Sequence, residues 1–185
     1  ATWISWPFDD ALWEGYLEPV RAEFARLVAT IASFEPVWLN VRDEEARSDA
    51  LRRLRDLGAP EERLRFNEVP LDDAWFRDNG PIFVVDGRGN TALTDWRFNS
   101  WGEKYPPWDQ DDAAPKSVEA RLGVRRFEVP IVLEGGAIEV NSEGVCLTTR
   151  SCLLSQRRNP NMTQDEYEQV LHEQLGIRHV VWLDG

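Results

Sequence analysis

Apolar residues recur along the first 70 positions at two spacings, one typical of strands and one typical of helices. In chain order, the sequence predicts a strand at 1–6, a helix at 18–31, a strand at 37–41, a helix at 43–57 and a strand at 64–69. Pro7 ends the first strand, Asp43 is suited to cap the second helix, and Gly58 is suited to end it. This alternation of strands and helices predicts an α/β fold.

The rest of the chain repeats a different order of elements. The predicted elements are a hairpin at 82–85 and 91–96, a helix at 114–122, a strand at 126–129, a second hairpin at 137–140 and 145–149, a helix after 163–166 and a strand at 180–183. Residues 163–166 have the composition of a capping box. Hairpin, helix and strand therefore occur twice in the same order, which predicts a modular fold whose units bury each other's faces.

An acidic stretch precedes each of these two repeats in the sequence. Residues 72–101 combine carboxylates, Arg77 and three tryptophans around a turn, in which Asp78 precedes Asn-Gly-Pro. Glu134 follows an apolar run and precedes two glycines, which allow a ligand or another backbone to come close. A guanidinium group is planar, and two carboxylates can bracket its donors. Because Asp78 and Glu134 hold comparable places in successive units, we expect them to converge on one pocket.

Structural alternatives remain open for each of these residues. Asp78 could cap a turn or pair with Arg77, and Gly-Gly after Glu134 often marks only a bulge. Glu139 alternates with apolar neighbours and is expected to face solvent. The acidic run Asp109, Asp111 and Asp112 is expected to be loop surface rather than a metal site.

Nine tryptophans are more than a chain of this length usually carries, and four of them, Trp75, Trp96, Trp101 and Trp108, fall in one region. Aromatic faces can hold a cation, although most tryptophans simply fill the core. The sequence leaves substrate contact open for each of the four.

Composition narrows the class of protein. With 42% hydrophobic and 29% charged residues, the chain has material for both a core and a solvated surface. A net charge of -12 argues against binding nucleic acid, because phosphates would be repelled. No apolar run is long enough to span a membrane, and no secretory signal is visible, so we expect a cytoplasmic protein that binds no membrane.

The sequence shows no complete catalytic set. Cys146 and Cys152 both have the surroundings of small core residues. His172 and His179 lie far from both cysteines, without the spacing of metal ligands or the company of a catalytic base. We therefore expect no metal site, and a chain that grips a substrate without itself completing the chemistry.

Six segments together resemble one known family. They are Thr2-Trp3-Ile4-Ser5-Trp6-Pro7, Trp75-Phe76-Arg77-Asp78-Asn79-Gly80-Pro81, Asp95-Trp96-Arg97-Phe98-Asn99, Leu133-Glu134-Gly135-Gly136, Leu147-Thr148-Thr149 and Arg158-Asn159-Pro160. In this order they resemble the agmatine deiminase family, within the bacterial-type peptidylarginine deiminases. The resemblance runs along the whole sequence, which makes it far more specific than a single motif.

The resemblance implies a pentein fold, an αβ propeller of five units around a pseudo-fivefold axis with the active site in its central channel. Residues 1–185 would form a partial pentein domain, about the first half to three-fifths, cut after Gly185. The implied reaction needs no cofactor: a cysteine thiolate attacks the guanidinium carbon, ammonia leaves, and a histidine-activated water releases the product. In that scheme Asp78 and Glu134 match the catalytic, substrate-binding carboxylates, and Trp75 matches an aromatic residue lining the channel.

The sequence also departs from the family pattern. The family's histidine motif, Gly-His-x-Asp, and its nucleophilic cysteine do not occur in residues 1–185. Glu103 stands where the family often has a second glycine, and Ile138-Glu139-Val140-Asn141 stands where it often reads Ile-His-Val-Asp. These two differences could shift the substrate preference but leave the acidic pair intact.

The leading hypothesis is hydrolysis of agmatine, a small cationic guanidine, to N-carbamoylputrescine and ammonia by the complete protein. Three alternatives remain: a peptidylarginine deiminase, a guanidine-binding fragment without chemistry, and an amidinotransferase. We expect residues 1–185 alone to be inactive. Whether copies of the chain form a homo-oligomer is left open.

Overall fold

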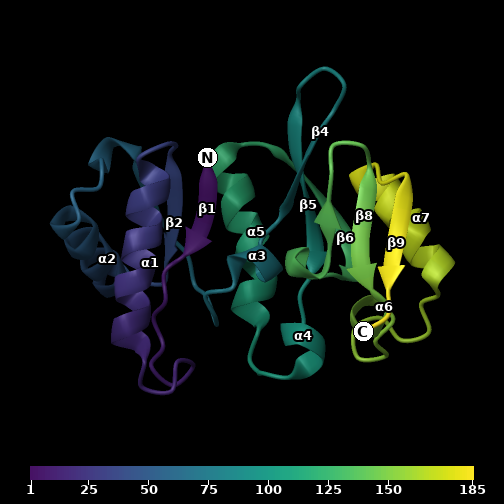
Figure 1. Ribbon diagram of the computed structural model, residues 1–185, viewed down its shortest axis with the longest axis horizontal. Coiled ribbons are helices and arrows are strands. Elements are labelled where there is room, and N and C mark those ends of the chain that lie inside the picture. Colours follow the sequence, from purple (N-terminus) through teal and green to yellow (C-terminus); the bar gives the residue numbers. More distant parts are fainter. The chain divides into compact units, whose positions relative to one another are not determined.

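The computed structural model describes residues 1–185, which form two compact units, Ala1–Phe76 and Arg77–Gly185 (Figure 1). We refer to them as the N-terminal unit and the C-terminal unit. Each is an α/β unit, as the order of apolar patterns predicts. None of the helices combines the length and the apolar character that crossing a membrane requires.

The N-terminal unit is a three-stranded parallel sheet with helices between the strands. Its elements are β1 (Thr2–Ser5), α1 (Leu17–Ala32), β2 (Val37–Val41), α2 (Glu44–Asp56), the 3-10 helix η1 (Glu61–Arg63) and β3 (Leu64–Glu68), with the strand order β1-β2-β3. Asp43 caps α2 by accepting a hydrogen bond from the Ala46 amide at 2.8 Å, and Gly58 follows the helix with a φ of +70°. The predicted cap and stop of this helix are thus confirmed.

The two faces of this sheet carry different side chains, because successive residues of a strand point in opposite directions. Val37, Leu39 and Val41 are buried in a core shared with α1 and α2. On the opposite face, the rings of Trp3 and Trp38 stack with their centroids 4.8 Å apart. The sheet therefore has one apolar face, packed against α1 and α2, and an opposite face that carries the stacked tryptophans.

The C-terminal unit contains two three-stranded sheets of the same design. The first is built from β4 (Ile82–Val85), β5 (Thr91–Arg97) and β6 (Arg125–Val132), and the second from β7 (Glu139–Val140), β8 (Val145–Thr149) and β9 (His179–Leu183). In each sheet the first two strands are antiparallel and the third pairs in parallel with the second. This confirms the predicted repeat of hairpin, helix and strand.

Helices connect these strands and bury the faces of the sheets. They are α3 (Phe76–Asn79), which spans the boundary between the units, α4 (Ser100–Glu103), α5 (Asp109–Leu122), η2 (Gly135–Ala137), α6 (Arg150–Leu153) and α7 (Gln164–Leu175). Trp96, Val129 and Leu133 of the first repeat share a core with Cys146 and Leu171 of the second. Thr163 and Glu166 form the predicted capping box of α7.

Several element boundaries differ from the sequence prediction, and strand β7 begins at Glu139 rather than at residue 137, which lies in η2. Helix α5 begins at Asp109 rather than at residue 114, so the acidic run is its first turn and not a surface loop. Carboxylates are favourable there because they face the positive end of the helix dipole, and Asp112 also accepts a hydrogen bond from the Phe98 amide at 2.7 Å. Strand β6 continues through Pro130, which is tolerated because β6 lies at the edge of its sheet.

Candidate functional site

Asp78 is held at both carboxylate oxygens. It lies in α3, directly before the Gly80-Pro81 turn that leads into β4. Its Oδ1 accepts a hydrogen bond from the Gly136 amide at 3.0 Å, and its Oδ2 accepts one from the Trp101 indole Nε1 at 2.9 Å. The structure thus brings Asp78 to the turn that follows Glu134, and Asp78 does not pair with Arg77. Whether both carboxylates serve one pocket stays a prediction.

The two glycines after Glu134 permit this approach. A Cβ atom on Gly135 would collide with the carbonyl oxygen of Arg77, and one on Gly136 would collide with the Asp78 carboxylate. Neither glycine has a positive φ, so close packing rather than an unusual backbone conformation requires them. The prediction that these glycines let another part of the chain come close is confirmed.

Glu134 is buried, with 2% of its side chain exposed, and it forms an ion pair with Arg158. The Nε of Arg158 donates to both carboxylate oxygens, at 2.8 and 2.9 Å. Burial by itself lowers the pKa of Arg158, but the hydrogen bond and the negative charge of Glu134 outweigh it, and the pKa is raised above the ordinary value. A buried carboxylate needs such a partner, because an unpaired buried charge is very costly.

The loop that carries Arg158 is fastened to the end of β6. The side chain of Asn159 exchanges two hydrogen bonds with the backbone of Val132, at 2.8 and 2.9 Å, and also donates to the Tyr167 hydroxyl at 2.6 Å. On the other side, Asn99 donates to the carbonyl oxygen of Arg157 at 2.9 Å. Since Val132 lies two residues before Glu134, these contacts place Arg158 against that carboxylate. Sequence reasoning missed this pair, although Arg158-Asn159-Pro160 was among the segments that carry the resemblance.

Trp101 reaches Asp78 from a strained backbone segment. Ser100, Trp101, Gly102 and Glu103 all have positive φ angles, of 51°, 56°, 85° and 64°. Such conformations are costly for residues other than glycine, and they cluster at functional sites. The indole packs edge-on against Phe98, with ring centroids 5.3 Å apart. Trp101 is therefore a site residue through its N–H group, which the sequence did not predict.

The other three tryptophans of this region differ in their surroundings. Trp96 is buried in the core, and its Nε1 donates to Thr94 at 2.8 Å. Trp75 is 44% exposed in the N-terminal unit, where its ring lies 5.5 Å from that of Trp13. Trp108 stands at the start of α5. The structure thus assigns Trp96 to the core, while the expected role of Trp75 stays a prediction.

A small cavity of about 250 Å³ adjoins the Asp78–Gly136 contact. It is lined by Gly136, Ala137, Ile138, Glu139, Leu147, Thr148, Thr149, Cys152 and Leu183. Burial raises the pKa of the Cys152 thiol, against the opposing effect of the positive charge on Arg158. Cys146 is fully buried, as predicted, and burial together with the charge of Glu139 raises its pKa to about 11. Neither thiol therefore has the lowered pKa of an activated nucleophile.

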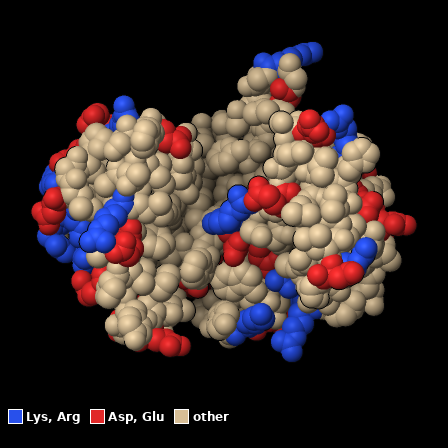
Figure 2. Space-filling model, viewed as in Figure 1, with Lys and Arg blue, Asp and Glu red and all other residues tan.

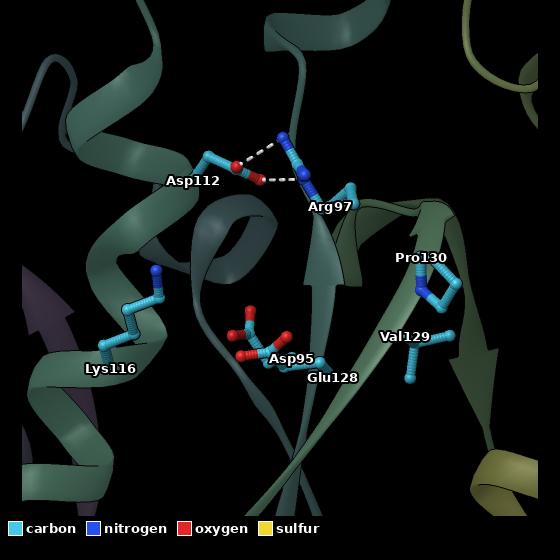
Figure 3. A pocket seen from close by; sticks show the side chains of 7 residues that line it. All are labelled: Asp95, Arg97, Asp112, Lys116, Glu128, Val129 and Pro130. Carbon is cyan, nitrogen blue, oxygen red and sulfur yellow. Dashed lines mark hydrogen bonds and ion pairs between the residues drawn. The ribbon is translucent and has the colours of Figure 1, made fainter.

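A second cavity of about 350 Å³ lies between α5 and the strands β5 and β6 (Figure 3). Its lining residues are Asp95, Arg97, Asp112, Lys116, Glu128, Val129 and Pro130. The carboxylates here already have partners, since Asp112 pairs with Arg97, and Asp95 and Glu128 both pair with Arg126.

Charged side chains of both signs are interspersed on the face of the molecule shown in Figure 2. No group of three or more histidine, cysteine, aspartate or glutamate side chains has an arrangement that could hold a metal ion. The structure shows two carboxylates held by donors, Asp78 and Glu134, and a small cavity that is lined by Gly136.

Solved structures with the same fold define the class of protein. Agmatine deiminase of Enterococcus faecalis superposes with a TM-score of 0.89 at 34% identity, over 98% of this chain and 49% of the other. The C. jejuni agmatine deiminase with substrate bound gives a TM-score of 0.85 at 28% identity, over 98% and 52%. The chain is thus an α/β protein with the fold of about half an agmatine deiminase.

Sequence comparison gives the family. The chain belongs to the Porphyromonas-type peptidyl-arginine deiminase family, whose profile matches residues 1–185. Among curated relatives, it is 40% identical to agmatine deiminase of Ectopseudomonas mendocina and 39% identical to that of Stutzerimonas stutzeri, over 98% of this chain and 49% of each relative. The chain spans about half the length of the curated relatives that it matches.

Proposed function

We propose that this chain supplies the guanidinium-binding carboxylates of an agmatine deiminase, which hydrolyses agmatine to N-carbamoylputrescine and ammonia. One observation carries the proposal: Asp78, with both oxygens fixed by donors, lies at the turn that immediately follows the buried carboxylate Glu134. A guanidinium group presents its N–H donors in a plane, and carboxylates on two sides can hold it in one orientation. The similarity to agmatine deiminases supports agmatine as the substrate.

In the proposed reaction, the carboxylates orient the guanidinium carbon toward a nucleophile from the part of the protein outside residues 1–185. A cysteine thiolate attacks that carbon, the C–N bond to one terminal nitrogen breaks, and ammonia leaves after taking a proton from a histidine. Water then attacks the same carbon, which releases the thiolate and the carbamoyl product. Asp78 and Glu134 contribute by fixing the reacting carbon and by holding the positive charge of the guanidinium group close by.

The same proposal assigns residues 1–185 to part of a pentein domain, with Trp75 lining the channel that leads to the carboxylates. The repeat of one strand order in two sheets of the C-terminal unit supports a propeller of αβ units. Two free cysteines suit a reducing compartment, in keeping with the cytoplasm. Peptidyl arginine is the second candidate substrate, because the matching family profile is described by that activity.

The test is turnover by the full-length protein. We expect ammonia release from agmatine and little from arginyl peptides. We also expect Asp78→Asn to lower kcat/KM by at least about 10- to 150-fold, because a charge-assisted hydrogen bond contributes about 1.5 to 3 kcal/mol. Asp56→Asn is the matched control, since Asp56 is exposed at the end of α2. Release of ammonia from arginyl peptides alone would overturn agmatine as the substrate, and normal turnover by Asp78→Asn would remove that carboxylate from the site.

A further inference from the structure

The proposed receptor for a guanidinium group already contains one. Glu134 is buried against Arg158, whose side chain is only 11% exposed. A charged pair this deep in the unit is costly to assemble and adds little net stability by itself. Glu134 lies two residues before Gly136, whose amide holds the Asp78 carboxylate, so the pair adjoins the proposed site rather than standing alone in the core.

The geometry of the pair leaves Glu134 able to bind a second cation. Arg158 contacts Glu134 through its Nε alone, which donates to both oxygens. It does not form a bidentate contact through its two terminal nitrogens. Each carboxylate oxygen has two lone pairs, so acceptor capacity remains on Glu134. The η nitrogens of Arg158 donate to no acceptor within the chain. Arg158 thus fixes the carboxylate from one side without blocking its other lone pairs.

The charges also balance. Asp78 and Glu134 carry two negative charges, and Arg158 carries one positive charge next to Glu134. Among these three side chains one net negative charge remains, which matches the single positive charge of a guanidinium head group. Without Arg158, a buried site holding a guanidinium would keep an uncompensated negative charge, which a low-dielectric environment disfavours.

We propose that Arg158 is a positioning residue for the deiminase reaction, which holds the Glu134 carboxylate in place for a planar head group that carries one positive charge. This inference rests on the proposed function. It makes a prediction that the proposed function does not make, namely that removing a positive charge weakens the binding of a positively charged ligand. Simple electrostatics predicts the opposite, since a competing or repelling cation would be removed.

The experiment uses the full-length protein with Arg158→Met, Arg158→Lys and the double variant Glu134→Gln with Arg158→Met. Two properties are measured: turnover of agmatine, and the rise in melting temperature on adding methylguanidinium chloride, which carries the planar head group alone. Arg126→Met is the matched control, because Arg126 is similarly buried and ion-paired, with 13% of its side chain exposed, but its partners Asp95 and Glu128 line the other cavity of the unit.

We expect Arg158→Met to lower kcat/KM by about 10- to 100-fold and to abolish the methylguanidinium response, with partial recovery in Arg158→Lys. Arg126→Met should lose stability but keep both properties. In the Glu134→Gln background, Arg158→Met should cause no further loss of the methylguanidinium response, because it acts through Glu134.

Three results would overturn the inference. They are an unchanged kcat/KM in Arg158→Met, a lower KM in that variant, which would make Arg158 a competitor of the substrate, and equal losses in Arg126→Met. A wild-type protein that responds to methylguanidinium but releases no ammonia from agmatine would end the proposed function while leaving the Arg158 comparison intact. A wild-type protein that shows neither property would end both.

Discussion

Replacing Trp101 with phenylalanine isolates one of the two hydrogen bonds that hold Asp78. The substitution removes the indole N–H, which donates to Oδ2 at 2.9 Å, and leaves the 3.0 Å bond from the Gly136 amide to Oδ1. A phenyl ring can still pack edge-on against Phe98 and Tyr105, whose centroids lie 5.3 and 6.0 Å from that of the indole. The change therefore acts mainly on the orientation of the carboxylate.

The size of the effect follows from the type of bond. A hydrogen bond to a charged acceptor contributes about 1.5 to 3 kcal/mol. If this energy is fully used to orient Asp78 in the transition state, kcat/KM should fall by about 10- to 150-fold. The loss should appear in kcat at least as much as in KM, because a loosely held carboxylate still attracts the cation but aims it poorly.

The assay is steady-state release of ammonia from agmatine by the full-length protein, with thermal unfolding measured in parallel. Trp96→Phe is the matched control, since Trp96 is buried and its N–H donates to Thr94 at 2.8 Å, within the core. We expect the control to lose stability and keep its activity. If Trp101→Phe keeps kcat/KM within about twofold of the wild type while a hydrogen bond of this strength is lost, Trp101 does not position Asp78.

Two further predictions concern the turn after Glu134 and the start of α7. Gly136→Ala should abolish most activity, because a Cβ atom at this position collides with the Asp78 carboxylate. The control Gly87→Ala should be neutral, since nothing lies within 4 Å of a Cβ atom there. Equal activity of the two variants would contradict this prediction. The backbone and side-chain hydrogen bonds from Thr163 lower the pKa of Glu166. The stabilisation by the Glu166 carboxylate is therefore fully present above its ordinary pKa of 4.5, and it is lost as the pH falls through the lowered pKa. Unfolding experiments should therefore show Glu166→Gln less stable than the wild type near pH 7 and equal to it in strong acid; a difference that is independent of pH would refute the cap.

Local signals were sufficient for most of the fold. The cap at Asp43, the hairpin turns and the capping box at Thr163 depend on neighbouring residues, and the structure confirms them. The start of α5 could not be predicted in this way. Asp112 accepts a hydrogen bond from the Phe98 amide and pairs with Arg97, which lies 15 residues earlier in the sequence. An acidic run resembles a loop until such distant partners are known.

The sequence also predicted only part of the candidate site. The repeat that can be read along the chain gives Asp78 and Glu134 comparable places, and the two glycines mark the close contact between Asp78 and the turn after Glu134. Arg158 gave no comparable signal, because an arginine in a polar segment usually lies in solvent. The segment around Trp101 gave a misleading signal, because Gly102 is its only residue that prefers a positive φ, although four residues adopt one. Both residues act through contacts that only the folded chain creates.

Three unfavourable features of the C-terminal unit occur around one carboxylate. Four consecutive residues have positive φ angles at Trp101, and strain of this kind costs about 1 to 3 kcal/mol for each residue other than glycine. Glu134 is buried in an ion pair with Arg158, and the side-chain amide of Asn79, the residue after Asp78, is buried without a hydrogen-bond partner in the chain. A core selected for stability alone would spread or remove such costs. Their concentration around Asp78 argues that this part of the unit is built for binding and orientation.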